Sequence, residues 1–201
     1  IATMRKPRRQ RDEARAWVDR GLAVEKGHPH GSTAGHDLAK LKRELLTKLG
    51  RRRDALEEAW AEFREEPSTF SHEELMRFVP KAERAAWHAK AMDAAERADL
   101  GSLIELWLET REIARLVRRL RTATAAEIED LSHYQTEPAA RRLAKSHPDV
   151  AAKVYRALGM RILNAKKSKY YDAALSHFEN AKRCYERSDL HREWAALVAD
   201  V

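Results

Sequence analysis

Hydrophobic residues recur along this chain at spacings of three and four positions, the pattern of amphipathic α-helices. Ala55, Ala59 and Phe63, for example, fall on one face of a helix over 54–65. Nowhere do four or more residues alternate between apolar and polar in the β-branched company that is typical of strands. The sequence therefore predicts an all-α fold that is more than about 65% helical.

Short turns divide these predicted helices into consecutive antiparallel pairs. Gly50 separates a helix over 36–49 from the helix over 54–65. A second pair follows, and Pro80 suits the first turn of its second helix. Capping boxes and prolines predict further helix starts at Ser71 with Glu74, at Thr124 with Glu127, and near Pro138 and Pro148.

The N-terminal segment differs from the rest of the chain. Residues 8–26 form a predicted amphipathic helix that ends at Gly27, and residues 27–35 contain three glycines and no apolar periodicity. We therefore expect a basic helix and a flexible His/Gly loop over 1–35, followed by a domain of helical hairpins over 36–201. The alternative is one continuous solenoid that includes the N-terminal helix.

The last third of the chain carries the clearest hairpin. Its residues Tyr155, Leu158, Gly159 and Ile162, then Ala174, Phe178 and Ala181, have the order and internal spacing of a tetratricopeptide hairpin. Gly159 and Ala174 would allow two helices to approach closely. The connector over 164–170 is about three residues longer than the usual repeat allows, and the helix over 189–201 should cover the open end. The side chains expected to be buried are Trp60, Phe63, Tyr155, Leu158, Ile162, Leu175 and Phe178.

Four stretches within residues 36–195 resemble an uncharacterised bacterial family of helical-repeat domains, a domain of unknown function. They are Leu49–Phe63, Leu75–His88, Leu103–Leu106 and Asn164–Ala174. The chain is more loosely similar to the helical C-terminal regions of bacterial SWIM-type zinc-finger proteins. The resemblance implies a short tetratricopeptide-like α-solenoid and supplies no activity. The zinc finger itself is absent, because Cys184 is the chain's single cysteine.

The net charge of +7 is unevenly distributed. Residues 1–53 carry 15 basic and 6 acidic side chains, residues 54–112 carry 7 and 15, and residues 113–201 carry 17 and 11. A basic protein attracts nucleic acid or acidic partners, but the acidic middle third argues against one continuous surface that follows phosphates.

We expect a cytoplasmic protein without a membrane partner. One cysteine allows no intramolecular disulfide, and no apolar run approaches the roughly 20 residues that span a bilayer. The residues around Met4 lack the apolar core of a signal peptide, so we expect no export signal. The chain starts without Met, so we expect its first residues to be either a remnant of cloning or part of an excised fragment.

No residue pattern predicts catalysis, a metal or a cofactor. His28, His30 and His36 are the densest histidine group, but Asp37 is their only nearby carboxylate. Cys184 follows His177 by seven residues on nearly one helical face, which raises a thiolate–base pair as one interpretation. A buried packing cysteine is the alternative that we favour. The five tryptophans lie among Ala and Leu at helical spacing, which indicates packing between helices.

The connector supplies the candidate binding residues, because long ordered connectors often carry function. We therefore predict a protein-interaction or scaffolding module that binds a protein or peptide and catalyses no reaction. The alternative is a nucleic-acid-associated protein that uses the basic N-terminal arm and the lysine-rich connector. The candidate binding residues are Asn164, Lys166, Lys167, Lys169, Tyr170 and Tyr171.

Overall fold

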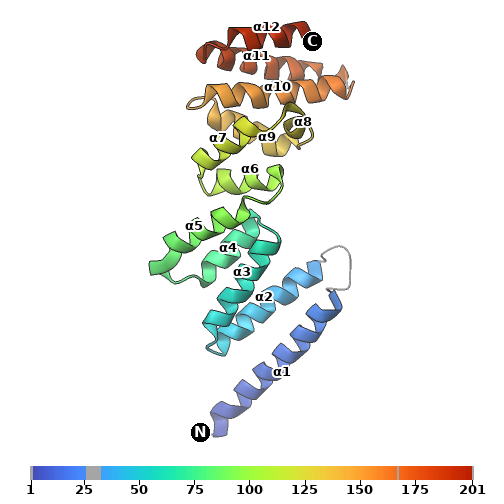
Figure 1. The fold of residues 1–201 in the computed structure, drawn as a ribbon. Coiled ribbons are helices and arrows are strands. Elements are labelled where there is room, and N and C mark those ends of the chain that lie inside the picture. The colour runs from blue at the N-terminus through green and yellow to red at the C-terminus, as the bar shows by residue number, and fades with distance from the viewer. Residues whose placement is uncertain (1, 26–32, 167, 201) are drawn as a thin grey trace. The chain divides into compact units, whose positions relative to one another are not determined.

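The computed structural model describes residues 2–25, 33–166 and 168–200. Helices account for 84% of these described residues, and none of the described residues lies in a strand, which confirms the all-α prediction (Figure 1). The helices group into two compact units, Ile1–Glu96 and Arg97–Val201. The division after residue 35 that the sequence suggests stays a prediction.

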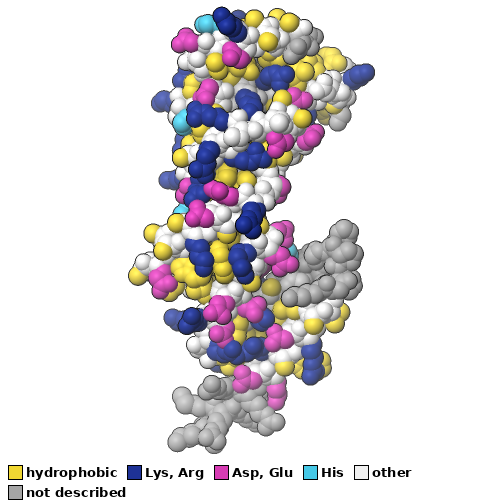
Figure 2. Space-filling view, viewed as in Figure 1, with side chains coloured by type: hydrophobic (Ala, Val, Ile, Leu, Met, Phe, Trp, Pro, Cys, Tyr) yellow, Lys and Arg dark blue, Asp and Glu magenta, His cyan; other side chains and the backbone are white. Residues whose placement is uncertain are grey.

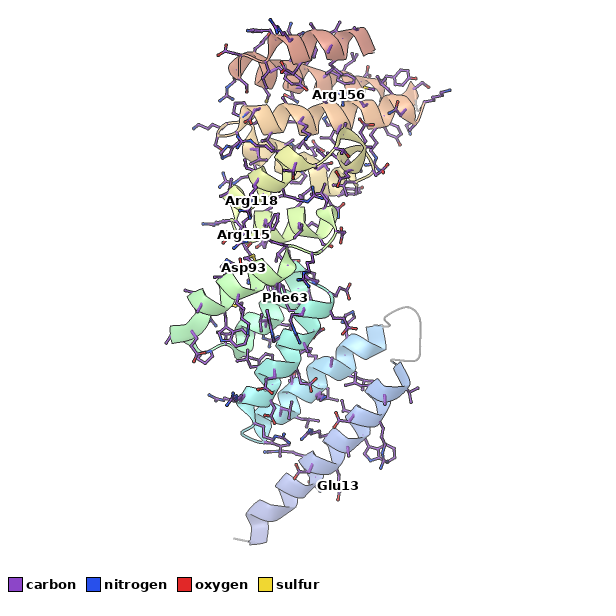
Figure 3. All side chains as sticks on the ribbon, in the orientation of Figure 1. Glu13, Phe63, Asp93, Arg115, Arg118 and Arg156 are labelled. Carbon is purple, nitrogen blue, oxygen red and sulfur yellow. The ribbon has the colours of Figure 1, made fainter. Side chains whose placement is uncertain are left out.

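Amphipathic helices build the N-terminal unit, and each packs on its neighbour in sequence (Figure 1). Its core consists of small and branched side chains such as Leu46, Ala55, Ala59 and Leu75, together with Phe63. Phe63 lies on the side of α3 that packs against α4, where its ring meets that of His72 (Figure 3). The elements are α1 (Ala2–Glu25), α2 (Thr33–Lys48), α3 (Arg52–Glu65), α4 (Thr69–Phe78), the 3₁₀ turn η1 (Lys81–Glu83) and α5 (Arg84–Ala95).

Two turns of this unit show how well local signals predict helix ends. Gly50 has a φ of +78°, which glycine adopts without strain, and the Arg51 N–H donates to the Leu46 carbonyl at 2.8 Å, so Gly50 ends α2 as predicted. The predicted capping box at Ser71 is wrong. Ser68 is the N-cap, and its side chain accepts from the Ser71 N–H at 3.1 Å, so α4 starts earlier than expected.

The C-terminal unit is also a succession of packed helices, of which α10 and α11 share the largest contact (Figure 1). Leu103, Leu106, Leu120, Val154 and Ala181 are among its buried side chains. The elements are α6 (Leu100–Glu109), α7 (Ile113–Thr122), α8 (Ala125–Glu129), α9 (His133–Leu143), α10 (Pro148–Asn164), the 3₁₀ turn η2 (Ser168–Tyr170), α11 (Tyr171–Arg187) and α12 (His191–Asp200).

Three predicted helix starts in this unit can be compared with the structure. Thr124 and Glu127 form the expected capping box, with the Glu127 carboxylate accepting from the Thr124 N–H at 2.7 Å. Pro148 occupies the first turn of α10 as predicted. Pro138 lies inside α9, so the prediction that a helix starts near Pro138 is wrong. The start of α9 is set instead by Ser132, whose hydroxyl accepts from the Tyr134 N–H at 3.3 Å.

Gly159 determines how closely α10 and α11 pack. A Cβ atom at this position would lie 2.5 Å from Cε1 and 2.6 Å from Cζ of Phe178, which is closer than carbon atoms approach. The Phe178 ring therefore rests on the bare backbone of α10. Ala174 and Tyr155 are also buried, so the close approach of two helices that the sequence predicts is present.

Burial was predicted correctly for four of seven side chains, namely Phe63, Tyr155, Leu158 and Phe178. Trp60 and Ile162 are half-buried. The prediction that Leu175 is buried is wrong, because 61% of its surface is exposed. It follows the buried Ala174 by one residue and so points about 100° away from the α10 interface.

The tryptophans and the last helix give a mixed result. Trp107 is buried as predicted. Trp17 is 69% exposed, so the prediction that it packs between helices is wrong. Helix α12 covers part of α11 through buried Leu197, and the rings of Trp194 and Tyr185 lie 6.5 Å apart. Val198 stays exposed.

Across the described helices, none is both long and apolar enough to cross a membrane.

Candidate functional site

The predicted binding residues lie where α10 ends and α11 begins. The Ala165 N–H donates back to the Arg161 carbonyl at 3.2 Å, and Lys166 then turns the chain with a φ of +52°. This left-handed conformation is unfavourable for a residue with a Cβ atom, and it directs the chain away from α10. The 3₁₀ turn η2 leads directly into α11. Lys167 lies outside the described residues.

Asn164 is held by the neighbouring helix. Its side-chain amide donates to a Glu129 carboxylate oxygen at 3.2 Å, and the other oxygen of Glu129 lies 3.7 Å from Nη1 of Arg156. Arg156 belongs to α10 (Figure 3). Glu129 therefore ties the end of α10 to α8, which gives Asn164 a positioning contact within the fold.

Cationic and aromatic side chains of the connector face solvent. Lys166 and Lys169 are exposed, and the exposed fractions of Tyr170 and Tyr171 are 50% and 41%. The Lys169 ammonium lies 5.9 Å from the centre of the Tyr170 ring, within the range of a cation–π contact. These four predicted site residues are thus brought together on one segment and are accessible to a partner.

Leu175 extends this surface, although it was predicted to be buried and not to belong to a binding site. It follows Tyr171 by four residues, so the two side chains project from neighbouring turns of one face of α11. The usable signal was this spacing, which forms a second apolar stripe beside the one made by Ala174, Phe178 and Ala181. We call the set of Lys166, Lys169, Tyr170, Tyr171 and Leu175 the connector patch.

The surroundings of the connector patch are cationic. Residues 161–183 contain six Lys and Arg side chains against two carboxylates, Asp172 and Glu179. Exposed apolar side chains rimmed by cations fit a partner that presents apolar side chains among carboxylates.

Several other basic clusters are engaged by carboxylates. Arg119 lies 3.0 Å from Glu127, and Arg121 lies 2.9 Å from Asp149. Arg51 is paired with Asp54 in the N-terminal unit. On the face shown in Figure 2, Lys and Arg side chains are interspersed with Asp and Glu. These pairings reduce the charge that the clusters offer to phosphates.

Cys184 is buried, as the packing interpretation expected. Burial raises the pKa of its thiol, although the Arg187 guanidinium acts in the opposite direction. His177 packs beside Tyr155, with ring centroids 6.3 Å apart, and burial lowers its pKa. A thiol that is both buried and harder to ionise is a poor nucleophile.

The histidine loop falls largely outside the described residues, which include His36 but neither His28 nor His30. In the part of the chain that the structure describes, no three His, Cys, Asp or Glu side chains converge as metal ligands would. His36 instead approaches Glu62, with Nδ1 and Oε1 3.4 Å apart.

A small cavity of about 190 Å³ opens beside this His36–Glu62 contact. Glu62 also pairs with Arg43, which is buried and reaches Glu74 at 3.5 Å. Because Arg43 neutralises Glu62, this carboxylate contributes to a structural ion pair. The cavity is lined by His36, Glu62, Glu66, Ser68, Phe70 and Ser71.

Comparison with known proteins adds no identification to this geometry. No protein-family model, no curated protein and no solved structure matches the chain.

Proposed function

We propose that the protein is an interaction module whose helix pairs form a short tetratricopeptide-like solenoid, and that the connector patch binds an acidic segment of a protein partner. Gly159 supports the solenoid, because a small residue allows Phe178 to pack against the backbone of the preceding helix, as tetratricopeptide pairs do. The module needs no catalytic residue, and it catalyses no reaction under this proposal.

The observation that carries the proposal is the exposure of Leu175 and Tyr171 beside Lys166 and Lys169. A leucine in the second turn of a helix that leaves 61% of its surface in water gains little from folding. Binding a partner would remove that surface from water, and the lysines would direct an acidic partner to it.

The proposal is tested by quantitative affinity capture from a bacterial lysate at two salt concentrations, with and without nuclease. The test variant replaces Lys166, Lys167 and Lys169 together by alanine. The matched control replaces Arg51, Arg52 and Arg53 by alanine, which removes the same charge from another exposed cluster.

We expect the lysine variant to lose about tenfold or more of a protein partner while the arginine variant retains it, and we expect high salt to weaken capture. Exposed lysines contribute under about 1 kcal/mol each to stability, so the helical content of the variant should be unchanged. Capture that nuclease abolishes would favour the nucleic-acid alternative. Equal losses in both variants would show that capture depends on overall charge and not on the connector patch.

A further inference from the structure

Two tryptophans of the N-terminal unit hold a lysine ammonium between them. Trp60 on α3 and Trp87 on α5 have ring centroids 5.6 Å apart and planes inclined by 78°. The Nζ atom of Lys90 lies 4.5 Å from the centre of the Trp60 ring and 4.3 Å from that of Trp87. Both distances are well within the roughly 6 Å limit of a cation–π interaction. The two indoles therefore form two walls of a site that accepts a cation.

Both walls are held in place by other contacts. The indole N–H of Trp87 donates to Glu83 at 3.2 Å, one turn earlier in the chain. Trp60 stacks on Phe63, which is fully buried, with ring centroids 6.0 Å apart. Both tryptophans are only partly buried, so a group from outside can reach the exposed part of each ring. A preorganised and accessible pair of rings lowers the entropy cost of binding.

Lys90 belongs to the same helix as Trp87, three residues later, and the residue is exposed. Its ammonium therefore lies against both indole rings at once. Residues 54–96 carry 11 acidic and 5 basic side chains, so the charge of this segment favours a cationic ligand.

We propose that Trp60 and Trp87 form a recognition site for a methylated lysine side chain of a partner protein, and that Lys90 occupies this site in the free protein. An unmodified ammonium keeps a strong hydration shell, which opposes its transfer onto aromatic faces. Methylation weakens that hydration and preserves the charge, so a methylated ammonium is the better ligand. It displaces Lys90, which returns to water at little cost because its stem is long and flexible.

The experiment uses tetramethylammonium chloride as the probe and the indole N–H signals in ¹H–¹⁵N NMR spectra as the readout. Sodium chloride at equal concentration controls for ionic strength. We expect saturable shifts of the Trp60 and Trp87 signals, and apparent binding about three- to tenfold tighter in Lys90→Ala, because the internal competitor is removed. Lys182→Ala is the matched control, since Lys182 lies over a single ring, Trp194, at 6.0 Å. It should leave the affinity unchanged.

Three results would overturn the proposal. The first is a Lys90→Ala protein that shows no saturable shift, and the second is methylammonium binding as tightly as tetramethylammonium. The third is binding of tetramethylammonium without binding of a short glycine-rich peptide that carries one trimethyllysine. Trp87→Leu, checked for helical content, should abolish the shift of Trp60. These outcomes are independent of the connector patch, which is assayed by different variants.

Discussion

Gly159→Ala tests the packing of α10 on α11 with the smallest change the chain allows. The added Cβ would lie 2.5 Å from Cε1, 2.6 Å from Cζ and 2.9 Å from Cδ1 of Phe178, so the ring or the helix must move by about 1 Å. Overpacking costs about 1 to 3 kcal/mol, and contacts as short as 2.5 Å put the cost here in the upper part of that range, at about 2 to 3 kcal/mol. Alanine also gains about 1 kcal/mol over glycine as a helix former. We expect a net loss of about 1 to 2 kcal/mol in the free energy of unfolding.

The assay is urea unfolding followed by circular dichroism, with hydrogen exchange of peptides from α10 and α11 to assign the loss to this helix pair. Phe178→Leu provides the control, because it removes the ring atoms that the new methyl group meets. In that background Gly159→Ala should cost about 1 kcal/mol less than in the wild-type protein. A Gly159→Ala protein that is as stable as the wild type would refute the close packing of the Phe178 ring on Gly159.

Three further predictions concern buried or capping groups. The Lys153 ammonium donates to three carbonyls at the end of α7, those of Leu120 and Arg121, both at 3.0 Å, and that of Ala123. Because Lys153→Met removes these hydrogen bonds, it should lower the free energy of unfolding, measured in urea, by about 1 to 3 kcal/mol. Burial, then the charge of His88, lowers the pKa of His72 to about 4, so the folded protein binds fewer protons than the unfolded chain between about pH 6.5 and 4. Stability should be full above pH 6.5 and fall by about 1 to 2 kcal/mol as the pH drops to 4, after allowance for solvent screening, and His72→Gln should remove that part of the pH dependence. Cys184 should react with a thiol reagent at least about tenfold more slowly in the native protein than in urea, since it is buried and its pKa is raised; equal rates would contradict its burial.

The helices and several of their ends could be predicted from the sequence because the signals that start and stop a helix lie within a few residues of each end. Gly50 stops α2 through its own backbone, and Thr124 with Glu127 caps α8 within four residues. The start of α4 was misplaced because both Ser68 and Ser71 are competent caps, and the choice depends on a further contact, the Ser71 hydroxyl donating to the Glu66 carbonyl at 2.8 Å.

The candidate sites were only partly predictable, because they depend on which face of a helix is covered. Leu175 was expected in the core because it is apolar, but it follows the buried Ala174 by one residue and so points away from the α10 interface. The cation site of Trp60 and Trp87 joins residues 27 positions apart, on helices whose packing no local pattern specifies. The lysines and tyrosines of the connector were found because their spacing and charge lie within one segment.

The most direct test of the proposed function is photo-crosslinking from the connector patch itself. A benzophenone amino acid placed at Leu175 should give one dominant protein adduct in a bacterial lysate, and excess unlabelled wild-type protein should suppress it. The same group at Tyr134, which is 79% exposed on α9, should give no such adduct. Excess protein carrying alanine at Lys166, Lys167 and Lys169 should fail to compete. The same adducts from both positions, or equal competition by the lysine variant, would contradict a partner site at the connector.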